Sequence, residues 1–275
     1  MGTLAATHVD TDRGMDVLSG TPRAGVIDRW IYVFTAASFV ILTLTGFIPD
    51  SLGKIAAVQA GERPAFPLVL HMHAALMGTF LLLLLTQTAL MATGRRQLHQ
   101  RLGVVAFGVA AVLVLVGLVL VPTMYHQIWN AAQAAPPAAR EKLKQIVLIR
   151  DNVMLIQLRI GILFPLFLLI GLYARGLNAG LHKRMMILAT AMPLPAAIDR
   201  ITWLPTTFPV SPLATDLYTL LAVSPMFLWD LFRNRKIHPA YLIWLGVNLP
   251  FAIAVHGLWG TEWWHSIAPR LMGVS

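Results

Sequence analysis

The sequence predicts an all-α fold, a polytopic membrane helical bundle of about seven transmembrane helices with its N-terminus in the cytoplasm. Of the 275 residues, 57% are hydrophobic and only 12% are charged, whereas soluble domains carry about 25% charged residues. The apolar residues form long uncharged segments, and roughly 18 or more such residues make a transmembrane helix. Most Lys and Arg residues lie in short loops between these segments.

Seven segments fit this description, and a proline or glycine marks most of their boundaries. The polar residues before the first segment lack the apolar core of a signal peptide. We therefore expect residues 1–25 to form a flexible cytoplasmic tail and residues 26–275 to form a single transmembrane domain. The expected spans are residues 30–48, 67–92, 102–124, 152–174, 184–203, 213–232 and 239–259.

The basic residues of short loops predict the orientation, because such residues stay on the cytoplasmic side. With seven spans, four groups of basic residues fall on the side of the N-terminus, and fewer fall on the other side. The four groups are Arg23 with Arg29, then Arg95, Arg96 and Arg101, then Arg175, Lys183 and Arg184, and finally Arg233, Arg235 and Lys236.

The outer side has two further features. Residues 138–150 are rich in Lys and Arg, and we expect them to lie on the outer surface as an amphipathic helix. Trp259, Trp263 and Trp264 cluster where the last span leaves the bilayer, as in an aromatic belt at the membrane interface.

Composition excludes several classes of function. The chain contains no cysteine, which excludes disulfides, thiolate catalysis and cysteine-bound metals or clusters. The net charge of +9 would suit nucleic acid only on a soluble body with a basic face. Here the basic residues flank apolar spans, so the expected partner is the lipid bilayer and not nucleic acid.

A short motif recurs at the start of three expected spans. Repeated helical hairpins are a common way to build membrane bundles, and the recurrence therefore raises the hypothesis of an internal duplication. The copies are Leu98-His99-Gln100-Arg101, Leu181-His182-Lys183-Arg184 and Ile237-His238-Pro239.

Seven of the nine histidines fall into two layers, and histidine is a common ligand of zinc, copper and haem iron. Two facing histidines at similar depth would hold a haem, and three would hold a metal ion. The bland alternative is a set of interfacial histidines that contact backbone or lipid headgroups. The outer layer is His71, His73, His126 and His256, and the inner layer, the less favoured metal site, is His99, His182 and His238.

His71 and His73 cannot both face one ligand, because residues two apart on a helix point in nearly opposite directions. His71 shares its stripe with Ala75 and Gly78, small residues that allow a neighbouring helix or a flat cofactor to approach closely. We therefore expect His71 to be the ligand and His73 to support it or to lie at a helix interface.

Arg159 lies inside the fourth expected span, where an unpaired charge is costly. Asp199 and Asp216 are candidate partners from the outer ends of the fifth and sixth spans. The pair is either a structural ion pair that locks the bundle or part of a buried anion site. Such a site would receive a haem propionate, a quinone or a lipid headgroup.

Three motifs resemble those of an uncharacterised family of bacterial polytopic inner-membrane proteins. The resemblance covers residues 30–260 and implies a multi-pass protein of the bacterial inner (cytoplasmic) membrane. A more distant resemblance to membrane cytochromes b, carried by histidines at helix ends, implies haem b and electron transfer. The motifs are H-x-H-A-A-L-M-G at 71–78 with Gln87 downstream, L-H-Q-R-L-G at 98–103 and L-H-K-R-M-M-I-L-A-T at 181–190.

These observations lead to one expected function and two alternatives. We expect a protein that binds haem b or a transition metal through His71, His126 and His256, with Arg159 beside the cofactor, in a redox or cofactor-handling role. The first alternative is a non-catalytic subunit or assembly factor of a larger membrane or respiratory complex. The second is a metal-dependent hydrolase similar to ceramidase-related seven-helix enzymes. Those use H-x-x-x-H on the last helix, where this chain has only His238 and His256, at opposite ends.

Overall fold

The computed structural model describes residues 24–274, and these residues form nine α-helices and no strand. Of the expected tail, residues 1–23 lie outside the described residues. The helices are α1 (Val26–Gln59), α2 (Leu68–Ala92), α3 (Arg96–Ala134), α4 (Pro137–Ala174), α5 (Ala179–Ala191), α6 (Leu194–Ile198), α7 (Leu213–Asn234), α8 (Pro239–Leu258) and α9 (Glu262–Leu271).

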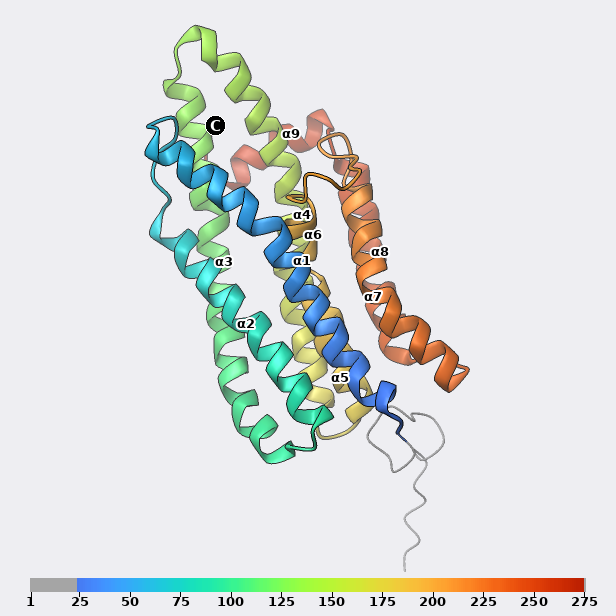
Figure 1. Cartoon of the computed structure of the whole chain (residues 1–275). Helices are drawn as coiled ribbons and strands as arrows, with labels where there is room; N and C mark the ends of the chain where they lie inside the picture. The colour runs from blue at the N-terminus through green and yellow to red at the C-terminus, as the bar shows by residue number, and fades with distance from the viewer. Residues whose placement is uncertain (1–23, 275) are drawn as a thin grey trace, which may run out of the picture.

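The long helices run up and down in one bundle (Figure 1). Five of them, α1, α2, α3, α4 and α8, are long and apolar enough to cross a membrane. This confirms the all-helical fold, and five helices have the length and apolar composition of membrane spans. The two remaining expected spans correspond to α7 and to α5 with α6. Their crossing of the membrane and the cytoplasmic N-terminus stay predictions.

The two ends of the bundle differ in their loops. The α2–α3, α4–α5 and α7–α8 connections lie at one end (Figure 1), which we call the basic end because of their Arg and Lys residues. The α1–α2 and α3–α4 connections and α9 lie at the other end, which we call the distal end.

The fifth expected span is broken into two helices. Helix α5 ends at Ala191 and α6 begins at Leu194. Pro193 and Pro195 lack the backbone N–H that would continue the helix. The break lets α6 turn against α1, where a Cβ added to Gly46 would lie only 2.1 Å from the carbonyl oxygen of Ala197.

The expectation of a separate amphipathic helix over residues 138–150 is wrong. These residues form the first turns of α4, which is 38 residues long and therefore spans about 57 Å at 1.5 Å per residue. This length exceeds the roughly 30 Å thickness of a bilayer core, and Figure 1 shows the α3–α4 hairpin projecting beyond the other helices at the distal end. Helical propensity continues through the basic run because no proline or glycine interrupts it.

Helix α5 lies at the centre of the core, where Met185, Ile187 and Leu188 are fully buried. The largest fully buried side chain is Arg184. Its guanidinium contacts Asp230 of α7, Nε to Oδ2 at 2.5 Å and Nη2 to Oδ1 at 2.6 Å. The sequence placed Arg184 in a loop at the headgroup level, but it is an interior ion pair that joins α5 to α7.

Candidate functional site

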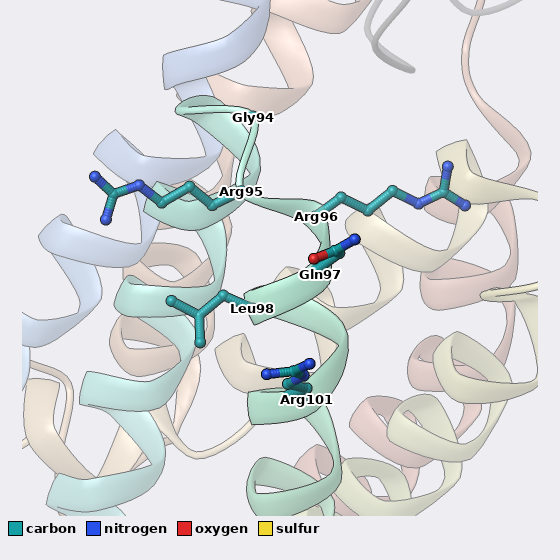
Figure 2. Close-up of a pocket in the computed structure, with 6 residues that line it drawn as sticks. All are labelled: Gly94, Arg95, Arg96, Gln97, Leu98 and Arg101. Carbon is teal, nitrogen blue, oxygen red and sulfur yellow. The ribbon is translucent and has the colours of Figure 1, made fainter.

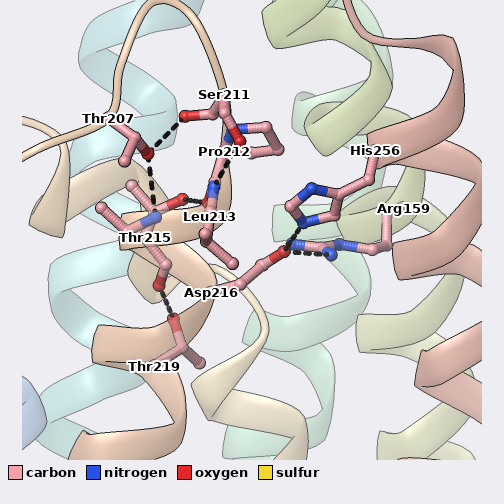
Figure 3. Close-up of polar contacts among 10 residues, drawn as sticks. Arg159, Thr207, Ser211, Pro212, Leu213, Thr215, Asp216, Thr219 and His256 are labelled. Atoms are coloured by element: carbon pink, nitrogen blue, oxygen red, sulfur yellow. Dashed lines mark hydrogen bonds and ion pairs between the residues drawn. The ribbon is translucent and has the colours of Figure 1, made fainter.

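Three ionisable side chains meet between α4, α7 and α8 towards the distal end (Figure 3). Arg159 of α4 donates two hydrogen bonds to Asp216 of α7, Nη2 to Oδ1 at 2.5 Å and Nη1 to Oδ2 at 3.2 Å. Nε2 of His256, on α8, lies 3.0 Å from the same Oδ2. The side chain of Arg159 is only 3% exposed, against 21% for Asp216, so the carboxylate is the more solvent-exposed member of the pair.

The loop before α7 fixes the position of Asp216. The hydroxyl of Thr207 accepts a hydrogen bond from the backbone N–H of Ala214 at 3.0 Å, and that of Ser211 accepts one from Leu213 at 3.2 Å (Figure 3). These bonds satisfy N–H groups that a helix start leaves unpaired. Asp216 lies in the first turn, where the partial positive charge of the helix end favours a carboxylate.

A cavity of about 110 Å³ adjoins the ion pair. Trp244, Leu245 and Leu249 of α8 form much of its apolar wall. Arg159 and Asn248 also line it. Two of their atoms, Nε of Arg159 and Oδ1 of Asn248, are buried and find no hydrogen-bond partner in the described part of the chain. Unpaired buried polar atoms are rare because each costs about 1–3 kcal/mol. One cavity is therefore lined by two residues that carry an unused donor and an unused acceptor.

The site unites two of the four residues expected to bind a cofactor, Arg159 and His256. It also selects Asp216 as the partner of Arg159, and Asp199 makes no contact with that side chain within the described part of the chain. The sequence contained both candidates at similar expected depth. Hydropathy did not predict the turn at residues 205–212, which brings Asp216 inward.

The other two expected ligands lie elsewhere. Nε2 of His126 is 2.6 Å from the carbonyl oxygen of Met272, and the ring of His71 packs edge-on against Phe66 with 6.0 Å between centroids. Among residues 24–274, no group of three or more His, Asp or Glu side chains is arranged to hold a metal ion. Binding of haem or a metal by the outer-layer histidines stays a prediction.

His71 and His73 face different surroundings on α2. His71, Ala75 and Gly78 are exposed, and a Cβ added to Gly78 would meet no atom within 4 Å. The small stripe therefore packs against no helix among the described residues, and the flat cofactor expected on this side stays a prediction. Nδ1 of His73, by contrast, is buried without a hydrogen-bond partner.

Another buried carboxylate, Asp151 of α4, was missed by sequence reasoning. It accepts a hydrogen bond from the hydroxyl of Tyr125 at 2.7 Å, and its Oδ2 lies 2.9 Å from Nδ1 of His265. The indole N–H of Trp264 donates a hydrogen bond to the backbone carbonyl of Asp151 at 2.7 Å. These contacts attach α9 to α4, and Trp264, 3% exposed, is an anchor of α9 and not part of an aromatic belt.

The inner-layer histidines do not form one group of three. The rings of His99 and His182 meet with 6.3 Å between centroids. Nδ1 of His238 instead accepts a hydrogen bond from the N–H of Ala240 at 3.1 Å and caps the start of α8. The first two copies of the repeated motif thus come together, and the third has a structural role.

The surface hollow at the α2–α3 turn is lined by Arg95, Arg96 and Arg101. Figure 2 shows that their guanidinium groups point in different directions, away from a common centre. Binding of a single phosphate needs converging donors. The turn therefore presents scattered positive charge suited to the headgroup region, and we place no ligand there.

Comparison of the chain with protein-family models, with curated proteins and with solved structures found no match. The function is therefore inferred from the geometry of the site.

Proposed function

We propose that this chain is an integral membrane protein that binds a small lipid-soluble quinol-type ligand in the cavity between α4, α7 and α8, in a redox or cofactor-handling role. One observation carries the proposal. Within residues 24–274, the buried Nε of Arg159 and the buried Oδ1 of Asn248 have no hydrogen-bond partner, and both residues line one apolar cavity. A phenolic hydroxyl satisfies both atoms, since its oxygen accepts from the guanidinium and its proton is donated to the amide oxygen.

The size of the cavity limits a ligand to a single ring at most. Its volume is about 110 Å³, and an apolar cavity of roughly 150 Å³ holds one benzene molecule. A haem is several times larger than such a ring. The volume therefore favours a ring headgroup over the haem expected from the sequence.

Charge also favours a neutral ligand. Arg159 already has a carboxylate partner in Asp216, so with His256 neutral the site carries no net charge. An additional anion, such as a propionate or a lipid phosphate, would be buried without its own counter-charge, which is strongly unfavourable. Among the three ligands considered for Arg159, a quinone-type headgroup fits best.

The wall of the cavity gives access from the membrane. Leu220, Leu245 and Leu249 line the cavity, and their side chains are exposed on the outside of the bundle. In a membrane protein such apolar residues face lipid. A ligand dissolved in the bilayer can therefore reach the cavity without crossing the aqueous phase.

The test compares the reduced and oxidised forms of one short-chain benzoquinone probe. The quinone has no hydroxyl and leaves Oδ1 of Asn248 unpaired, at a cost of about 1–3 kcal/mol. We therefore expect the quinol to bind the purified protein roughly 5- to 150-fold more tightly than the quinone, as measured by quenching of tryptophan fluorescence.

Two variants make this test specific. Asn248→Leu removes the acceptor and should abolish the preference for the reduced form. Ser224→Ala is the control, because the hydroxyl of Ser224 bonds the carbonyl of Leu221 on α7 and the residue does not line the cavity. Equal affinity for both forms in the parent protein, or an unchanged preference in Asn248→Leu, would refute the proposal.

A further inference from the structure

Two imidazole rings from separate hairpins meet near the basic end. His99 belongs to α3 and His182 to α5, and each occupies the second position of the motif Leu-His-x-Arg. Their ring centroids are 6.3 Å apart and their planes are nearly perpendicular, at 79°. The repeated motif therefore places two potential nitrogen ligands close together, with their rings edge to face.

A hydrogen bond fixes the tautomer of His182. Its Nδ1 lies 2.7 Å from the carbonyl oxygen of Gly171, and since a carbonyl only accepts, Nδ1 must carry the proton. Nε2 of the neutral ring then keeps its lone pair. Histidines that ligate a metal through one ring nitrogen commonly donate the N–H of the other nitrogen to a backbone carbonyl, which orients the ring.

One nitrogen of this pair and one nearby side-chain oxygen have no hydrogen-bond partner. Nδ1 of His99 and Oε1 of Gln87 are both buried, and neither makes a hydrogen bond within residues 24–274. Gln87, on α2, is only 9% exposed. Its amide lies beside the first turns of α3, since its Nε2 would be 3.5 Å from a Cβ added to Gly103. Two buried atoms near this site thus find no hydrogen-bond donor in the part of the chain that the structure describes.

A thioether lies on the same side of α5 as His182. Met186 follows His182 by one helical turn, and residues four apart share a helix face. The Sδ of Met186 would be 3.1 Å from a Cβ added to Gly171, the residue whose carbonyl binds His182. Imidazole and thioether ligands together favour copper, and the soft thioether favours its monovalent form.

We propose that His99 and His182 bind one copper(I) ion, with Met186 and Gln87 as additional ligands. Two imidazoles on opposite sides of an ion with bonds of ~2 Å have centroids roughly 6 Å apart, close to the 6.3 Å observed. Arg96 and Arg175 act electrostatically on these rings. Their positive charge and a ligand set without carboxylates disfavour a divalent ion more than a monovalent one.

The experiment titrates Cu(I) into the full-length detergent-purified protein under anaerobic conditions, against a chromogenic Cu(I) chelator. We expect one tightly bound equivalent in the parent. His99→Ala should lose it, and Met186→Leu and Gln87→Leu should bind at least tenfold more weakly. His238→Ala is the matched control, because this third histidine of the motif series caps α8 and should leave Cu(I) binding unchanged.

Thermal unfolding of each variant verifies that it is folded, and His99→Gln replaces His99→Ala if the smaller side chain unfolds the protein. Unchanged stoichiometry in the His99 variant would overturn the proposal. Tighter binding of Zn2+ than of Cu(I) by the parent would also overturn it. The quinol site lies at the distal end with no shared residue, so the two proposals succeed or fail independently.

Discussion

The ion pair of Arg159 and Asp216 yields an unusual prediction, because its two members differ in their surroundings. Arg159→Leu leaves Asp216 partly exposed, at 21%, with Nε2 of His256 still 3.0 Å away. Asp216→Asn instead leaves a guanidinium that is 3% exposed without any carboxylate. The second change should therefore destabilise the protein much more than the first.

The magnitudes follow from the cost of leaving one member of a buried pair alone, about 3–5 kcal/mol. We expect a loss near that range for Asp216→Asn. For Arg159→Leu we expect roughly 1–2 kcal/mol, because His256 and water compensate the remaining carboxylate. The double variant should be no less stable than Asp216→Asn alone, which gives a coupling of at least about 1 kcal/mol.

The assay is thermal or denaturant unfolding of the detergent-solubilised protein, carried out as a double-mutant cycle. Asp199→Asn provides the control, because Asp199 does not contact Arg159 within the described residues, and its effect should add to that of Arg159→Leu. Additive losses for Arg159 and Asp216, or a larger loss for Arg159→Leu than for Asp216→Asn, would refute this reasoning.

Two other predictions concern topology and the outer-layer histidines. Reporter fusions after residues 97, 179 and 235 should report the cytoplasm and a fusion after residue 58 the periplasm, because basic short loops stay inside; a periplasmic signal at two of the three inner positions would contradict this. If the outer layer binds haem, the purified protein should show a Soret band that weakens in His256→Ala but not in His265→Ala, whose ring contacts Asp151; a parent without a Soret band would reject haem binding.

The helices themselves were predictable because lipid-facing residues are apolar at almost every position. Five expected spans coincide with long apolar helices, and α7 begins within a residue or so of its expected start. Hydropathy alone could not show how far α4 extends beyond the bilayer. Residues 138–150 have the composition of a surface helix, whether or not they continue into a span.

The interior contacts were less predictable. A charged residue within an apolar segment shows that an unpaired charge there would be unfavourable, but it does not show which residue pairs with it. Arg159 was recognised because it interrupts an apolar span. Arg184 was missed because it stands beside Lys183 in a motif that reads as a cytoplasmic loop. Its partner Asp230 also accepts a hydrogen bond from the hydroxyl of Tyr241 at 2.7 Å. Three helices must be in place before this pair exists, and no local pattern records that.

The pairing of His99 with His182 was partly predictable, less so than the helices and more so than the interior ion pairs. The repeated motif was visible, and it indicated that the two residues occupy equivalent positions at the starts of α3 and α5. It could not show that equivalent positions face each other, which depends on how α2–α3 and α4–α5 pack. His238 has the same place in the motif series but caps its own helix, which shows that sequence equivalence alone does not assign a role.

The close approach of α1 and α6 gives the last prediction. A Cβ on Gly46 would lie 2.1 Å from the carbonyl oxygen of Ala197, so Gly46→Ala must push two backbones apart, and overpacking of this kind costs about 1–3 kcal/mol or more. Gly78→Ala is the matched control, since that Cβ would meet nothing within 4 Å and alanine is the better helix former.

We therefore expect Gly46→Ala to lower the midpoint of thermal unfolding by several degrees, at roughly 2–4 °C per kcal/mol for a chain of this size. Gly78→Ala should leave the midpoint unchanged or raise it. A small effect at Gly46 would mean that α6 does not rest on α1. The break after Ala191 would then have to be explained by its prolines alone, because the helix contact would no longer account for the direction in which α6 turns.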